Sequence, residues 1–196
     1  MSAGAGTKVR RVVCPGSFGS RHSSYSPLTK SWYTFSYENC GVYRSAESPE
    51  PEEGRSFNAV TSRGRKEMLQ PYVAAYDPLT GKETWRHFTR GLHFSGLLTT
   101  GGNLLFGGGI YGDFWALDAA TGKRLWEFNT GSGITGSPVS YAVNGRQYVA
   151  IGSGVSSTAP ALYNSMMTPG ERAKLPPVGS VLFVFALPQA GAGDAQ

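Results

Sequence analysis

Few side chains in this 196-residue chain have the types and spacing that chemistry needs. The three histidines, His22, His87 and His93, show no H-x-x-x-H or similar spacing, so they predict no metal site. Cys14 and Cys40 are 26 positions apart and form no C-x-x-C pair, which argues against zinc binding and against a redox dithiol. They can form one disulfide or remain two free thiols.

Two acids that recur at a fixed distance belong to an internal repeat. Residues 75–85 (AYDPLTGKETW) and residues 116–126 (ALDAATGKRLW) both fit the pattern A-x-D-x-x-T-G-K-x-x-W. All six fixed positions recur at an offset of 41 residues, which chance does not explain. The chain is therefore expected to repeat one structural unit.

Each residue type in the repeat suits a β-hairpin. The Asp side chain can accept hydrogen bonds from amides two or three residues further on, and the Gly can take a positive φ at the end of the turn. The Trp then lies on the returning strand, and we expect both copies to be buried against a neighbouring unit. The motif residues are Asp77, Thr80, Gly81 and Trp85 in the first copy, and Asp118, Thr121, Gly122 and Trp126 in the second.

The flanking sequence adds further short strands. Leu97–Phe106 predicts strand, Gly-Gly turn, strand, and Asn144-Gly145 suits the type I′ turn of a tight hairpin. The chain has 27 glycines and only 16% charged residues, which is typical of an all-β protein with many turns. About four strands in every 40 to 45 residues is the signature of a β-propeller blade.

We therefore predict an all-β fold, a partial β-propeller of four-stranded antiparallel blades joined by tryptophan-docking motifs. The ring is incomplete, with about three to four blades of the usual 4–8. This favours a fragment, a truncated product or half of an assembly. The predicted units are a partial blade with a basic N-terminal end (1–45), a polar surface loop (46–70), two blades (71–110 and 111–152), a Gly/Ser/Pro-rich loop (153–178), a closing strand (179–187) and a tail (188–196).

Charge and hydropathy exclude several classes of function. The net charge of +5 resides in residues 1–30, while the other 166 residues carry 13 basic and 13 acidic side chains. This argues against a nucleic-acid-binding face, which needs a basic stripe on a folded surface. The longest clear apolar run, residues 181–187, is far shorter than the roughly 20 residues of a membrane-spanning helix. Residues 1–13 contain no apolar stretch of a signal peptide, so we expect no signal peptide in this chain.

The repeat resembles the tryptophan-docking motif of the quinoprotein alcohol dehydrogenases, eight-bladed propellers that depend on pyrroloquinoline quinone (PQQ). Residues 13–19 (VCPGSFG) are similar to the family's CPG-x-FG segment, and Tyr25-Ser26-Pro27 is similar to its Y-S-P blade. Residues 97–107 (LLTTGGNLLFG) and 137–154 (SPVSYAVNGRQYVAIGSG) are similar to two further family segments. The similarity covers most of residues 12–187 and implies the C-terminal part of such an enzyme.

The resemblance implies periplasmic oxidation of an alcohol or sugar by hydride transfer to PQQ, above a Ca²⁺ ion that polarises the quinone carbonyl. It places the catalytic base and the calcium ligands upstream, so we assign no catalytic residue and no metal ligand here. The residues that it implies for cofactor binding are Phe94, Ser95, Val155 and Ser156. Phe94 stands where the family often has Trp, and the loop at 152–158 lacks the family's Gly-Trp pattern.

Two other interpretations remain open. A cofactor-free propeller built from the same repeat can act as a scaffold that binds proteins through an exposed strand edge. An inactive remnant would fold poorly and bind nothing. In either case a partner chain that completes the ring is an alternative to a longer polypeptide. Substrate, electron acceptor and cysteine state are not predicted.

Overall fold

The computed structural model describes residues 12–13, 16–18, 22–38, 41–45, 53–54, 60–64, 70–155 and 166–186. The described part is nearly all β, with one turn of helix, α2 (Pro169–Arg172). The strands are β1 (Val12–Val13), β2 (Gly16–Phe18), β3 (Ser24–Ser26), β4 (Ser31–Glu38), β5 (Gly41–Ser45), β6 (Val60–Gly64), β7 (Gln70–Tyr76), β8 (Glu83–Phe88), β9 (Leu98–Thr99), β10 (Leu104–Gly108), β11 (Asp113–Asp118), β12 (Arg124–Asn129), β13 (Val139–Val143), β14 (Arg146–Gly154) and β15 (Ser180–Ala186). Within these ranges no helix is long and apolar enough to cross a membrane.

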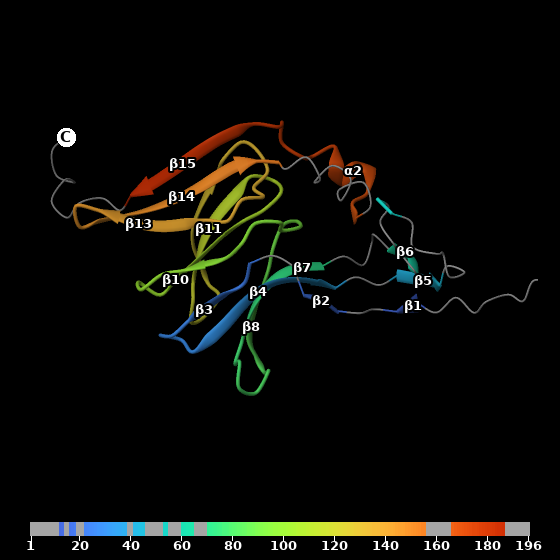
Figure 1. Cartoon of the computed structure of the whole chain (residues 1–196), viewed down its shortest axis with the longest axis horizontal. Helices are drawn as coiled ribbons and strands as arrows, with labels where there is room; N and C mark the ends of the chain where they lie inside the picture. Colours follow the sequence, from blue (N-terminus) through green and yellow to red (C-terminus); the bar gives the residue numbers. More distant parts are fainter. Residues whose placement is uncertain are drawn as a thin grey trace, which may run out of the picture.

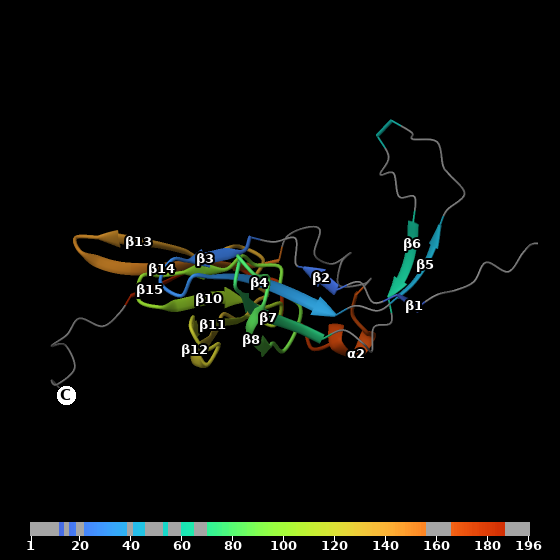
Figure 2. The ribbon, with the colours of Figure 1, turned by 90° about the horizontal axis from the view of Figure 1, so that it is seen from below.

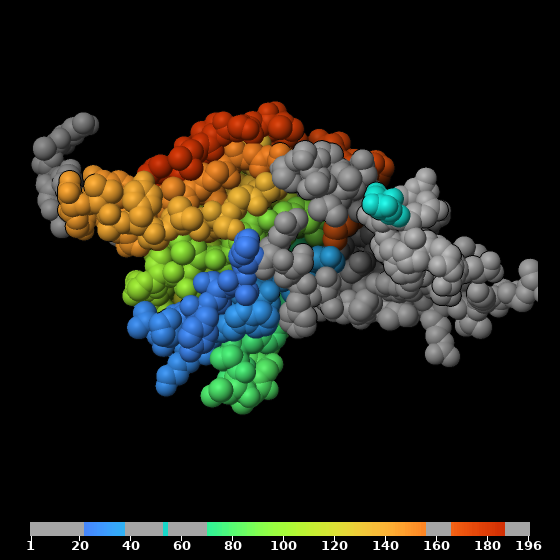
Figure 3. Space-filling view, viewed as in Figure 1, coloured from blue at the N-terminus to red at the C-terminus, as the bar shows by residue number. Residues whose placement is uncertain are grey.

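The strands form three main antiparallel sheets that follow one another along the chain (Figure 1). The first sheet has the order β2-β4-β7-β8, with β3 also paired to β4; the second is β9–β12 and the third is β13–β15. Strands β1, β5 and β6 make a further small sheet, drawn apart from the others in Figure 2. In the space-filling view the first, second and third sheets lie against one another in sequence order (Figure 3). The predicted fold class, a partial β-propeller of four-stranded antiparallel sheets, is confirmed.

The boundaries of the sheets differ from those of the predicted units. Strands β7 and β8 pair with β4, whereas β9 and β10 pair with β11 and β12, so the predicted unit 71–110 is divided between two sheets. The predicted loop 46–70 contains β6. A repeat of 41 residues fixes the period of the fold but not its starting point. The motif connects the third and fourth strands of a sheet, and each new sheet begins after the Trp-bearing strand.

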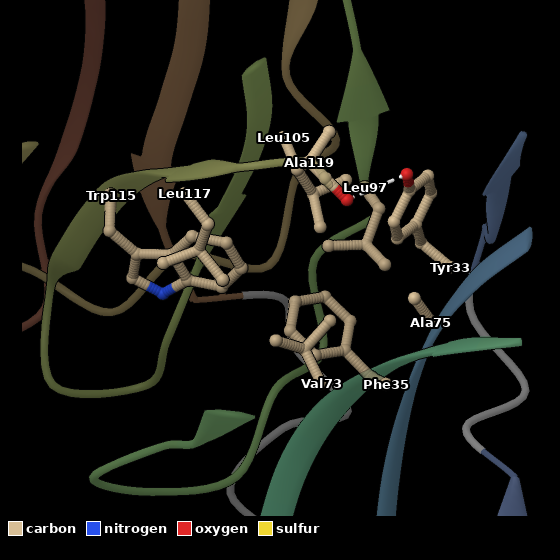
Figure 4. Close-up of a cluster of buried hydrophobic side chains, with 9 residues drawn as sticks. All are labelled: Tyr33, Phe35, Val73, Ala75, Leu97, Leu105, Trp115, Leu117 and Ala119. Carbon is tan, nitrogen blue, oxygen red and sulfur yellow. Dashed lines mark hydrogen bonds between the residues drawn. The ribbon is translucent and has the colours of Figure 1, made fainter. Parts of the chain in front are cut away.

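Two apolar layers hold the sheets together. The layer between the first and second sheets contains nine buried residues, drawn in Figure 4: Tyr33, Phe35, Val73, Ala75, Leu97, Leu105, Trp115, Leu117 and Ala119. The layer between the second and third sheets contains Phe106, Phe114, Ala116, Ile134, Val149 and Ile151. Alternate residues of β11 enter the two layers, because side chains of a strand point to opposite faces. The second sheet is therefore apolar on both sides, as a middle blade must be.

The two motif turns have the same backbone geometry. Asp77 Oδ1 accepts hydrogen bonds from the amides of residues 79 and 80 at 2.8 and 3.4 Å, and Asp118 Oδ1 accepts those of residues 120 and 121 at 3.0 and 2.9 Å. Gly81 and Gly122 have φ of 69° and 72°. The turn of the β13–β14 hairpin has φ of 50° at Asn144 and 77° at Gly145, as a type I′ turn requires.

The Trp of the first motif docks onto the turn of the second. Trp85, on the outer strand of the first sheet, donates its indole N–H to the carbonyl oxygen of Ala119 at 3.1 Å. The hydroxyl of Tyr33 donates to the same oxygen at 2.9 Å. The Trp85 ring lies against Gly122, where a Cβ atom would come within 2.5 Å of ring atom Cε3. Packing and hydrogen bonding thus join the first sheet to the second at one turn.

Trp126 occupies the equivalent position on β12 but differs in its surroundings. It is 38% exposed, which does not match the burial that we predicted for both tryptophans. Its ring meets Phe185 of β15, with centroids 5.1 Å apart. Within the described residues the third sheet has three strands and no D-x-x-T-G turn, so the surface on which Trp85 docks has no counterpart opposite Trp126.

The docking contact predicts that replacement by alanine destabilises the chain unequally at the two motif glycines. Gly81→Ala and Gly122→Ala both place a Cβ atom on a residue with positive φ, which lowers the free energy of unfolding by about 1–2 kcal/mol. Gly81 has open space around it, whereas the new Cβ at Gly122 would clash with the Trp85 ring. We expect Gly122→Ala to lower the free energy of unfolding by a further 1–3 kcal/mol or so in urea titrations. Equal losses in the two variants would contradict the docking contact.

Candidate cofactor-facing site

An apolar cluster, here named the seam cluster, gathers side chains from all three sheets at one end of the strands. Tyr37 comes from β4, Tyr111 from the β10–β11 turn, Phe94 from the loop before β9, and Val155 from the residue after β14. The cluster consists of Leu92, Ile110, Tyr111 and Met167, which are buried, and Tyr37, Phe94, Val155, Met166 and Leu175, which are partly buried. Phe94 and Val155, two of the predicted cofactor-binding residues, therefore pack against the same group of buried residues.

Ser95 is placed differently from Phe94. It is fully buried, donates its hydroxyl to the carbonyl oxygen of Gly108 at 2.8 Å and accepts the amide N–H of Gly108 at 3.0 Å. Its hydrogen-bonding capacity is thus used by the backbone of β10. Ser156, the fourth predicted cofactor-binding residue, lies outside the described residues.

His93, the residue before Phe94 in the sequence, hydrogen bonds to the same backbone carbonyl as Ser95, that of Gly108. Its Nδ1 lies 2.8 Å from the carbonyl oxygen of Gly108 and donates to it when it carries the proton. The ring stacks on Phe35, with centroids 4.3 Å apart and 6° between the planes. Because residues 93 and 95 both turn toward Gly108, the residue between them turns away, into the seam cluster.

His93 is held in its neutral form. Burial lowers the pKa of His93 to about 4, against the smaller opposing effect of its hydrogen bond to Gly108. Within the described part of the chain its Nε2 has no hydrogen-bond partner. A neutral, buried imidazole between two sheets is suited to positioning a loop and not to transferring protons near neutral pH.

Asp113 and Arg90 add charge beside the cluster. Asp113, at the start of β11, is 8% exposed, and burial raises the pKa of its carboxyl to about 6. Gly109 leaves room for this carboxylate, since a Cβ there would approach its oxygens to 2.6 Å. The guanidinium of Arg90 lies over the Tyr111 ring, 4.8 Å from its centroid. A buried acid, Asp113, and a cation, Arg90, thus flank Tyr111.

The segment that carries α2 lies across the cluster. Met167 is 3% exposed and packs with the buried members of the seam cluster. Thr168 caps α2 through a reciprocal pair of hydrogen bonds with Glu171, and Arg172 donates to the carbonyl oxygen of Met167 at 3.1 Å. At the other end the amide of Gly179 donates to Ser132 Oγ at 3.0 Å. The segment is therefore fixed at both ends.

Sequence reasoning missed Tyr111, Arg90, Asp113 and Met167. Met167 contacts the cluster through a long connection, and no local pattern encodes such a contact. These residues belong to the site only because three sheets converge there.

The described residues fit the ring system of a planar cofactor better than they fit a metal. Phe94 and Val155 are partly buried and offer apolar surface, and Arg90, over the buried ring of Tyr111, offers a cation for an acidic substituent. Ca²⁺ needs six to eight oxygen ligands. Within the described residues no three His, Cys, Asp or Glu side chains lie close enough together to hold a metal ion.

Sequence comparison relates the chain to dehydrogenases. Residues 88–149 match the family model described as glucose/ethanol/alcohol dehydrogenase, β-propeller domain (PQQ). Quinoprotein alcohol dehydrogenase PedH of Pseudomonas putida is 42% identical over 127 residues, which cover 63% of this chain and 21% of that protein. A lanthanide-dependent methanol dehydrogenase of Methylacidiphilum fumariolicum is 30% identical over 198 residues, covering 89% of this chain and 32% of that protein.

Solved structures agree with the sequence matches. A europium-containing methanol dehydrogenase superposes with a TM-score of 0.71 and 30% identity, over 84% of this chain and 32% of that one. The chain is thus similar, in sequence and in fold, to part of the quinoprotein alcohol dehydrogenases. A quinohemoprotein alcohol dehydrogenase from Comamonas testosteroni gives a TM-score of 0.64 at 25% identity, over 84% of this chain and 25% of that one. The chain spans about a fifth to a third of the length of these matched dehydrogenases.

The buried His93 predicts a pH dependence of stability. The unfolded chain binds a proton at His93 near pH 6.5 and the folded chain only near pH 4, so His93 lowers the free energy of unfolding as the pH falls from 6.5 toward 4. Asp113 acts in the opposite sense, because its raised pKa favours the folded state at low pH. We expect His93→Phe to lose less stability than the parent chain between pH 6.5 and 4.5, by about 1–3 kcal/mol in urea titrations. Parallel pH profiles would contradict a neutral buried His93.

Proposed function

We propose that this chain forms the C-terminal propeller region of a PQQ-dependent dehydrogenase that oxidises an alcohol or a sugar. One observation carries the proposal: Phe94 and Val155, which the family resemblance selects, come from different loops and meet in one apolar cluster. The names of the related enzymes support an alcohol substrate, as they are alcohol and methanol dehydrogenases. Family resemblance supports the periplasm as the compartment.

In this proposal the residues of the chain bind and orient the cofactor without reacting. Phe94 would present its ring to the planar quinone and Val155 would line the same surface, and Ser156 follows Val155 in the sequence. Ser95 contributes through Gly108, since its hydroxyl is committed to that backbone. Arg90, whose guanidinium lies over the Tyr111 ring, would pair with a carboxylate of the cofactor. PQQ, when bound, accepts the hydride of the alcohol, and Ca²⁺ in the full enzyme polarises the quinone carbonyl.

The remainder of the active site belongs to polypeptide outside this sequence. The catalytic base and the calcium ligands have no assigned position here, and the related enzymes are several times longer than the match. We infer that further blades, from a longer polypeptide or from a partner chain, complete the ring around the substrate. This chain alone is expected to be inactive as a dehydrogenase.

A cofactor-free scaffold is the second candidate, and the exposure of the third sheet favours it. Leu182 and Val184 of β15 are 69% and 48% exposed, as is expected of an edge that binds another strand. The two functions differ in what they require of Phe94. A cofactor site needs the aromatic ring, whereas a scaffold does not.

Calorimetric titration with PQQ, with and without Ca²⁺, tests the proposal. We expect saturable binding by the parent chain, weakened about tenfold or more by Phe94→Ala, because a stacked aromatic ring contributes about 1 kcal/mol beyond its buried area. Leu79→Ala is the control, since Leu79 is 94% exposed on a distant turn. No binding by a well-folded parent chain would overturn the proposal and leave the scaffold or an inactive remnant.

A further inference from the structure

Three buried hydroxyl side chains meet where the second and third sheets come together. Thr130 follows β12, Ser132 lies two residues further on, and Ser153 belongs to β14. They are 8%, 4% and 3% exposed, and we name them the hydroxyl cluster. Burying a polar group is unfavourable unless it forms hydrogen bonds, so each of these side chains needs a partner inside the protein.

Each member of the hydroxyl cluster has such a partner. Thr130 Oγ1 lies 3.1 Å from the carbonyl oxygen of Gly112 and 2.9 Å from that of Ser132. Ser153 Oγ lies 2.9 Å from Thr130 Oγ1 and 3.1 Å from the same Ser132 carbonyl oxygen. Ser132 Oγ accepts the amide N–H of Gly179 at 3.0 Å. The cluster thus connects the β10–β11 turn, the end of β14 and the end of the segment that carries α2.

The same three parts of the chain supply members of the seam cluster. Tyr111 comes from the β10–β11 turn, Val155 from the residue after β14, and Met167 from the segment that carries α2. Phe94 is held separately, through the contacts of its two neighbours with Gly108. The hydroxyl cluster therefore anchors the side of the seam cluster that the Gly108 contacts do not reach.

The backbone beside the hydroxyl cluster also touches the seam cluster directly. Gly133 has no side chain, and a Cβ atom there would lie 2.9 Å from the carbonyl oxygen of Ile110 and 3.1 Å from Val155 Cγ2. Gly112 has a φ of 84°, and a Cβ atom there would lie 2.9 Å from the carbonyl oxygen of Ser132. Because such close packing transmits strain, a movement of this backbone would reach Val155 and the β10–β11 turn.

We propose that Thr130 and Ser153 are positioning residues of the cofactor site. Their hydroxyl groups hold Val155 in place, together with Tyr111 and the Arg90 guanidinium that lies over its ring. The inference rests on the proposed function, which assigns the seam cluster to the cofactor. Residues that bind a ligand must be locked by supporting hydrogen bonds, and a buried pair of hydroxyl groups suits that role.

Substitution of Thr130 separates the effect of its hydroxyl from that of its volume. Thr130→Val keeps the volume and removes the hydroxyl, so the Gly112 carbonyl loses a donor and Ser153 loses an acceptor. Thr130→Ser keeps the hydroxyl and removes only a methyl group. Thr34→Val is the matched control, because Thr34 is 2% exposed and its hydroxyl donates to the carbonyl oxygen of Phe35 within β4.

Hydrogen exchange tests the positioning without the cofactor. In Thr130→Val we expect the amides of Gly154 and Gly179, which donate to Gly133 and Ser132, to exchange about fivefold faster or more, as when one hydrogen bond is lost. Ser153→Ala should have the same effect, whereas Thr130→Ser and Thr34→Val should leave these rates unchanged. The amides of β4 and β7 should exchange as in the parent chain.

Two exchange results would overturn the proposal. One is an equal acceleration in all sheets of Thr130→Val, which a purely structural role of the hydroxyl would produce. The other is a Thr130→Ser variant that exchanges as fast as Thr130→Val, since the hydroxyl would then not be the group that matters.

Calorimetric titration with PQQ connects the positioning to binding. We expect Thr130→Val to bind PQQ about fivefold more weakly than the parent chain or worse, and Thr130→Ser and Thr34→Val to bind like the parent. Equal affinities of Thr130→Val and the parent would overturn the proposal. A parent chain that binds no PQQ would overturn the proposed function and the cofactor role of the hydroxyl cluster together, while the exchange rates still decide whether the cluster holds the three segments.

Discussion

The carbonyl oxygen of Ala119 is the point on which the arrangement of the sheets depends. It accepts hydrogen bonds from the Trp85 indole and the Tyr33 hydroxyl, which both belong to the preceding sheet. The Asp118 turn presents this carbonyl, and Gly122 gives the indole ring a flat surface. A turn within one sheet thereby fixes the position of its neighbour, and the apolar layer beneath the contact excludes water from it.

That docking has consequences at the other end of the strands. Because the first and second sheets are held in one relative position, the loop before β9 can place His93 and Ser95 on the backbone of Gly108. Phe94 then projects into the seam cluster beside Val155 and Tyr111. The candidate cofactor surface is therefore a product of packing between sheets, and none of the sheets could form it alone.

Local features of the fold could be predicted from sequence because they depend on short-range chemistry. The Asp-Thr-Gly turns, the Asn144-Gly145 hairpin and the four-strand period all follow from residues within a few positions of one another. The starting point of each sheet could not be predicted, since a repeat has no intrinsic origin. Nor could the exposure of Trp126, which depends on what lies opposite it in the third sheet.

The same distinction applies to the site. Family resemblance selected Phe94 and Val155, and the structure places both in one cluster. It also selected Ser95, but the Ser95 side chain turns to Gly108. The side chains of Phe94 and Ser95 point to opposite sides, as those of neighbouring residues do in a strand. Met167 and Arg90 reach the cluster through tertiary contacts that leave no pattern in the sequence.

The free energy of unfolding of four tryptophan variants tests the docking of the sheets most directly. Trp85→Ala should cost about 3–5 kcal/mol, as for a large core truncation, and Trp85→Phe should cost about 1 kcal/mol or somewhat more for the lost hydrogen bond. Trp126→Ala and Trp126→Phe should each cost clearly less than their Trp85 counterparts, because Trp126 is more exposed. A cost below about 1 kcal/mol for Trp85→Ala would contradict the role of Trp85 in joining the sheets.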